Sequence, residues 1–122
     1  MSDDLVYRYK AEVVDVYDGD TCTLKVDLGF NMSFVLKARL YGVDTPELRS
    51  KDDKEKARAY KARDFVREIT RGKEVRIETH KQGKYGRYLV DLFVEDEGGA
   101  WVKVNSLLIL RGLAKAYYGG KR

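Results

Sequence analysis

The chain has 122 residues, of which 43% are hydrophobic and 36% are charged. This composition excludes a disordered chain, and the length suits one domain, so we expect a single folded, soluble domain over residues 1–122. The net charge of +4 favours polyanionic partners. No apolar run approaches the roughly 20 residues that a membrane span requires, so we expect no membrane association.

The charge is unevenly distributed along the chain. Residues 1–48 carry nine acids and five bases, residues 49–76 six and eleven, and residues 77–122 five and eight, giving net charges of −4, +5 and +3. One arrangement that fits this division places a cation among the first carboxylates and a phosphate backbone along the basic remainder.

The start of the chain and its cysteine bear on the compartment. Residues 1–10 have neither the apolar stretch nor the cleavage site of a signal peptide, so we expect a cytoplasmic protein as written, or a secreted one if a leader was trimmed. Cys22 is the only cysteine, which excludes an intrachain disulfide. It alternates with Leu24 and Val26, and this pattern predicts a small buried hydrophobe.

Three strands are predicted in the first third. Residues 13–16 and 21–28 are strand-like, and Tyr17-Asp18-Gly19-Asp20 between them contains the Asp-Gly turn signal of a hairpin. A third strand is predicted over residues 33–41. Its alternation assigns four side chains to the buried face: Phe34, Leu36, Ala38 and Leu40. Arg39 falls on the opposite face.

The remainder alternates between helices and strands. Residues 55–70 read as a helix that ends at Arg71-Gly72. Its apolar side is expected to use Ala57, Tyr60, Phe65 and Ile69. Strands are predicted over residues 74–79 and 88–94, joined by a turn, and a short helix over 102–110. The predicted class is α+β, mainly β: a five-stranded OB-fold barrel with a helix after strand 3 and a short C-terminal helix.

Acidic residues cluster in two breaks between these elements. Asp18 and Asp20 lie in Asp-Gly-Asp-Thr, and Asp44 and Glu47 lie in Val-Asp-Thr-Pro-Glu. Oxygen ligands suit calcium, and the absence of Cys-His spacing argues against structural zinc. Each motif alone is weak, because Asp and Gly also favour turns for local reasons.

Four separated motifs strengthen the signal when they are taken together. They are Asp18-Gly19-Asp20-Thr21, Arg39-Leu40-Tyr41-Gly42-Val43-Asp44-Thr45-Pro46-Glu47, Lys84-Tyr85-Gly86-Arg87 and Gly112-Leu113-Ala114-Lys115. In order and spacing the chain resembles the staphylococcal nuclease-like, or thermonuclease, family. The resemblance implies a five-stranded barrel with helices and a Ca²⁺-dependent nuclease that acts on DNA and RNA.

The resemblance also implies a role for individual residues. The metal ligands would be the Asp20 and Asp44 side chains and the Thr45 carbonyl oxygen, with Asp18 behind them. Glu47 matches the carboxylate that orients or deprotonates the attacking water.

Two arginines, Arg39 and Arg87, match the pair that grips the phosphate. Cleavage with Arg87 near the departing 5′ oxygen would leave a 3′-phosphate. Lys84, Tyr85 and Tyr118 match positions that contact the nucleotide, although an ungapped count is all that selects Tyr118 over Tyr117.

The same residues allow two other functions. A barrel that binds nucleic acid or a protein partner without cutting would have lost catalytic groups, and a calcium-binding structural domain leaves both arginines unexplained. His80 has no nucleophile or metal partner nearby in sequence, so a plain surface role is predicted. We expect a monomer whose partner is a DNA or RNA substrate.

Overall fold

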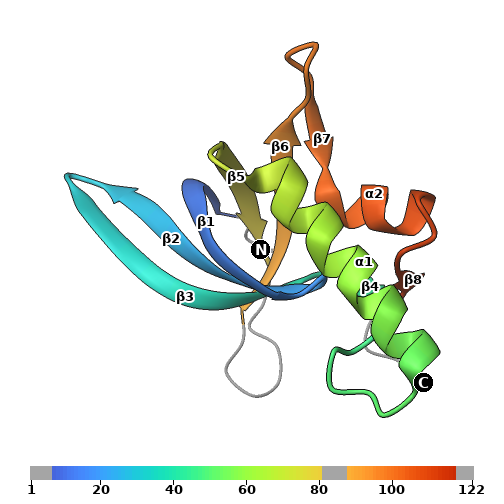
Figure 1. Cartoon of the computed structure of the whole chain (residues 1–122). Coiled ribbons are helices and arrows are strands. Elements are labelled where there is room, and N and C mark those ends of the chain that lie inside the picture. Colours follow the sequence, from blue (N-terminus) through green and yellow to red (C-terminus); the bar gives the residue numbers. More distant parts are fainter. Residues whose placement is uncertain (1–6, 81–87, 118–122) are drawn as a thin grey trace, which may run out of the picture.

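The computed structural model describes residues 7–80 and 88–117, and within these ranges it has eight strands and two helices (Figure 1). The strands are β1 (Arg8–Asp18), β2 (Thr21–Gly29), β3 (Met32–Leu40), β4 (Val43–Asp44), β5 (Glu74–Thr79), β6 (Tyr88–Glu95), β7 (Trp101–Lys103) and β8 (Lys115–Ala116). The helices are α1 (Asp53–Thr70) and α2 (Val104–Leu110). Neither helix is long and apolar enough to span a membrane.

A closed barrel organises these elements. The main sheet has the order β3-β2-β1-β5-β6-β7, and β3 also pairs in parallel with β6. This additional pairing joins five strands into a ring and removes their open edges. The predicted OB-type, mainly β fold is therefore confirmed. A separate pairing of β4 with β8 forms a small second sheet that the sequence did not predict.

The barrel interior is filled by aliphatic side chains. Fully buried examples are Leu24, Leu40, Ile77, Leu92 and Leu108. Cys22 is buried among them, as its alternation predicted. Burial raises the pKa of the Cys22 thiol from 9.0 to about 12, and the nearby charges of Asp20 and Asp15 act in the same direction. The thiol is a packing group.

Helix α1 packs on β1 through small residues, while α2 packs against β6 (Figure 1). Asp52 caps α1 by accepting a hydrogen bond from the Lys54 backbone N–H at 3.0 Å. The buried positions are Ala59, Ala62, Val66 and Thr70. The predicted apolar side is therefore wrong for Ala57 and Tyr60, which are exposed; Phe65 and Ile69 pack at its border. Alanines let the helix approach the barrel closely.

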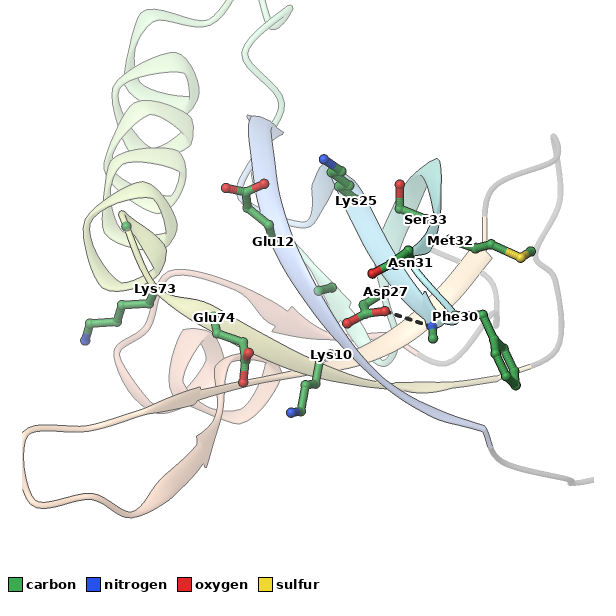
Figure 2. Close-up of a pocket in the computed structure, with 13 residues that line it drawn as sticks. Lys10, Glu12, Lys25, Asp27, Phe30, Asn31, Met32, Ser33, Lys73 and Glu74 are labelled. Atoms are coloured by element: carbon green, nitrogen blue, oxygen red, sulfur yellow. Dashed lines mark hydrogen bonds between the residues drawn. The ribbon is translucent and has the colours of Figure 1, made fainter.

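The hairpin of β2 and β3 extends beyond the body of the barrel (Figure 1). Phe34, predicted to be buried, is 49% exposed for this reason, since alternation selects a face and not its depth. At the tip, Gly29 donates a hydrogen bond to Asp27 at 2.8 Å, and Phe30 is 97% exposed (Figure 2).

Strand pairing explains why two predicted element boundaries, the start of β1 and the start of α2, are wrong. β1 begins at Arg8 instead of residue 13, because its first residues pair with β5. Trp101–Lys103, whose last two residues were predicted as helix, pairs with β6, and α2 starts at Val104.

Candidate active site

The buried carboxylate of Asp20 joins the β1–β2 turn to the segment after β4. Asp20 is 4% exposed, and its Oδ2 accepts a hydrogen bond from the Thr45 backbone N–H at 3.1 Å. Its Oδ1 accepts one from the Thr21 hydroxyl at 3.0 Å. Its backbone carbonyl also accepts from the Leu40 N–H at 2.8 Å. These bonds fix the carboxylate at the end of β3.

Arg39 lies between two carboxylates. Its register partner in β2 is Thr21, so β-pairing places the arginine beside Asp20. Nη1 is 3.5 Å from Asp20 Oδ2, and Nη2 is 3.6 Å from Asp44 Oδ1. Nη2 also donates to the Val43 carbonyl at 3.1 Å. Charge-assisted hydrogen bonds are about 2.7–2.9 Å long, so neither carboxylate binds the guanidinium tightly, and its donors remain suited to an added anion.

Gly19 permits the close packing beneath this site. A Cβ at this position would lie 2.8 Å from Ala62 Cβ and 3.1 Å from Thr45 Cγ2. Both neighbours belong to elements that fix the site, because Ala62 is a buried residue of α1 and Thr45 carries the N–H that binds Asp20. The Asp-Gly-Asp motif therefore needs glycine for contact with α1.

The carboxylates of Asp20 and Glu47 lie close enough to Asp18 to act on it electrostatically. Asp18 Oδ1 accepts a hydrogen bond from the Leu48 backbone N–H at 3.4 Å. Burial raises the pKa of Asp18, and the charges of Asp20 and Glu47 raise it further, against the lowering effect of Leu48 and Arg49. Asp18 is thus repelled by two neighbouring acids, and a bound cation would relieve this repulsion.

Asp18→Asn is expected to stabilise the protein at neutral pH. The folded pKa of Asp18 lies above its ordinary value of 3.8, so folding is penalised once the pH rises through that raised pKa, and the penalty is absent below the unfolded pKa. Asparagine can still accept the Leu48 bond. Thermal melts should therefore show a higher Tm for the variant at pH 7 and a vanishing difference near about pH 3. A lower Tm at pH 7 would contradict this.

The oxygen ligands of the site fit a hard cation whose remaining ligands come from substrate or water. Among the described residues, no group of three or more His, Cys, Asp or Glu side chains could hold a metal ion. The site does offer the carboxylates of Asp20 and Asp44, and the buried Thr45 hydroxyl has no hydrogen-bond partner in the described part of the chain. A buried unpaired oxygen commonly marks a water or ion position. An all-oxygen set of this kind suits calcium.

Comparison with known proteins identifies the family. The family described as staphylococcal nuclease homologue matches residues 37–122. The chain belongs to the staphylococcal nuclease homologue family. It is also 31% identical over 130 residues to the uncharacterized protein MJ1439 of Methanocaldococcus jannaschii, which covers 90% of this chain. The chain spans 60% of that relative's length.

The family match includes Arg39, Asp44 and Glu47 but begins after Asp18 and Asp20. Asp20, which precedes the matched range, contacts Thr45 and Arg39 within it, so the residues on both sides of this boundary belong to one site.

Four predicted site residues lie outside the described residues: Lys84, Tyr85, Arg87 and Tyr118. On either side of the first three, the His80 N–H donates to the Leu89 carbonyl at 2.8 Å, and Tyr88 pairs with Ala38, the neighbour of Arg39. Tyr117 is described, and its ring centroid lies 5.7 Å from Arg39 Cζ. Tyr117 therefore lies at the site, while the nucleotide contact of Tyr118 stays a prediction.

His80 belongs to a side-chain network, so its predicted plain surface role is wrong. Its Nε2 lies 2.9 Å from Asp91 Oδ2, and its ring stacks on Tyr41 with a centroid separation of 3.9 Å. Lys103 Nζ is 3.8 Å from the same Asp91 oxygen. The partners come from β6, from β7 and from the residue that follows β3, and no local pattern in the sequence brings these segments together.

Asn105 of α2 is a second residue that sequence reasoning missed. It is 4% exposed, accepts a hydrogen bond from the Leu92 N–H at 2.9 Å and donates to the Tyr41 carbonyl at 2.8 Å. It thereby ties α2 to β6 and to the chain that leaves β3, two residues after Arg39. An asparagine early in an apolar helix was the available signal, since a buried amide requires partners.

Proposed function

We propose that the protein is a calcium-dependent nuclease that hydrolyses phosphodiester bonds in DNA and RNA with little base selectivity and leaves 3′-phosphate ends. One observation carries the proposal: Arg39 lies 3.5 Å from Asp20 and 3.6 Å from Asp44. A guanidinium that can bind phosphate and two carboxylates that can bind a metal ion therefore share one site. A binding module would need no such combination. A structural calcium site would not need the arginine.

Calcium would be held by the Asp20 and Asp44 carboxylates and the Thr45 carbonyl oxygen. When bound, it would polarise a phosphoryl oxygen and offset the negative charge of the transition state. Arg39 would bind the phosphate through its planar fork, which can make paired hydrogen bonds. Only a modest rearrangement is required, because its contacts with both carboxylates are long.

Glu47 would handle the attacking water. It is exposed, and its charge is felt by Asp18, so it borders the acidic site while remaining open to solvent. A carboxylate within one water's reach of phosphorus can orient or deprotonate that water. Arg87, in the family's pattern, would stabilise the departing 5′ oxygen.

Digestion of single-stranded DNA and of RNA, with calcium or with a chelator, tests the proposal. We expect cleavage only with calcium, products whose ends are sensitive to a 3′-phosphatase, and about 10²–10⁴-fold lower kcat for Glu47→Gln. Glu68→Gln, an exposed substitution on α1, serves as the matched control and should retain full activity. If verified folded protein cleaves neither substrate in either condition, the non-catalytic binding barrel replaces the nuclease.

A further inference from the structure

A groove of about 740 Å³ opens directly beside the candidate active site. Asp44, Thr45 and Glu47 line it where it meets the site. Its walls come from α1 and from the segment after α2, which contribute four basic side chains: Arg58, Lys61, Arg111 and Lys115. The groove is thus continuous with the proposed reaction centre but is formed largely by other residues.

The four basic side chains are exposed, and none of them forms an ion pair within the described ranges. Other arginines of α1 behave differently. Arg63 lies 3.0 Å from Asp64, and Arg67 lies 3.9 Å from Asp15. Because two of the three groove acids, Asp44 and Glu47, belong to the proposed reaction centre, the groove beyond it carries a surplus of positive charge.

The basic wall is held in a fixed position relative to the site. Lys115 in β8 pairs with Asp44 in β4, so the two residues share one small sheet. The guanidinium of Arg111 lies 5.5 Å from the ring centroid of Phe65, so a cation–π contact links the segment after α2 to α1. A ligand that enters the groove therefore meets these cations beside the reaction centre.

A second hollow in the molecule provides a contrast. It is lined by three lysines and three acids, Lys10, Lys25, Lys73, Glu12, Asp27 and Glu74, so its charges balance (Figure 2). A balanced hollow has no reason to attract a polyanion. Of these two hollows, only the groove beside the active site combines a surplus of positive charge with access to the reaction centre.

We infer that this groove binds the nucleic-acid strand on one side of the scissile phosphate, with Arg58, Lys61, Arg111 and Lys115 contacting successive phosphates. Among the residues that the structure describes, none that lines the groove is aromatic, so these walls offer charge without a surface for base stacking. Contacts of this kind are independent of base sequence. The inference rests on the proposed function only for the position of the cleaved bond.

The salt dependence of binding tests the inference. A fluorescent twelve-nucleotide oligothymidylate is titrated with protein over a series of salt concentrations, with a calcium chelator present so that the probe is not cleaved. Each phosphate contact to a single strand contributes about 0.7 to the slope of log K against log salt, so Arg58→Gln/Lys61→Gln should reduce the slope by about 1.4. The quadruple glutamine variant of the groove should reduce it by about 2.8.

The control is Lys10→Gln/Lys25→Gln, which makes the same charge change in the balanced hollow of Figure 2. We expect it to leave the slope unchanged. An unchanged slope in the groove variants, an equal reduction in the control, or no saturable binding by the wild type would each overturn the inference. Cleavage is assayed separately: groove-dependent binding by a protein that never cuts would refute the proposed nuclease and leave the groove as the strand-binding surface.

Discussion

Arg39→Lys should lower kcat for DNA cleavage by about 10²–10³-fold while the protein stays folded. Lysine keeps the positive charge but lacks the planar fork. The guanidinium reaches Asp20 Oδ2 at 3.5 Å with one nitrogen, and Asp44 Oδ1 at 3.6 Å and the Val43 carbonyl at 3.1 Å with the other. One ammonium group cannot span these positions and also present two donors to a phosphate. Single-turnover rates at saturating substrate measure the effect.

A purely structural role for Arg39 must be separated from this one. If the arginine only neutralises the two carboxylates, Arg39→Lys should keep nearly the full rate at saturating calcium, because lysine retains the positive charge. If it binds the phosphate, the loss persists at saturating calcium. Arg63→Lys is the matched control, since Arg63 pairs with Asp64 on α1 and does not line the site. A rate of more than about a third of wild type would refute the phosphate clamp.

Local sequence patterns predicted the barrel because each strand carries its own alternation and each turn its own signal. The Asp-Gly turn and the alternation at Cys22, Leu24 and Val26 appear in the structure as expected. The depth to which a side chain is buried was not predictable in the same way. Phe34 alternates correctly but lies where the hairpin leaves the barrel, and Ala59 and Ala62 of α1 are buried because the helix approaches closely. The exposure of Phe34 and the burial of the two alanines both depend on the positions of other elements, which a local pattern does not contain.

The site was predictable as far as residue type allowed. Turn-forming acids and the family resemblance selected Asp20 and Asp44, but alternation placed Arg39 on the face away from the core. Its pairing with Thr21 in β2, which is a long-range register, brings it to Asp20. The contact of Gly19 with Ala62 and the bond from Asn105 to Tyr41 join segments more than 40 residues apart. No local period encodes such contacts.

Asn105→Ala should reduce the free energy of unfolding by roughly 2–4 kcal/mol. The substitution leaves the buried Leu92 N–H without its acceptor at 2.9 Å and the Tyr41 carbonyl without its donor at 2.8 Å. An unpaired buried group costs about 1–3 kcal/mol, and alanine offers no replacement. Urea unfolding measures the change. Ser106→Ala, on the exposed side of the same helix, should stay within about 0.5 kcal/mol of wild type.

The position of Asn105 extends this prediction to the closure of the barrel. The same amide also donates to the Val90 carbonyl at 3.1 Å, which accepts the Tyr41 N–H at 2.8 Å. Asn105 therefore reinforces the junction of β3 with β6, just beyond Arg39. Under native conditions the Tyr41 amide should exchange its hydrogen faster in Asn105→Ala than a uniform loss of stability explains, when compared with Leu24 in the β1–β2 pairing. Equal acceleration at both amides would show that Asn105 stabilises the whole barrel without a particular effect on the strand that carries Arg39.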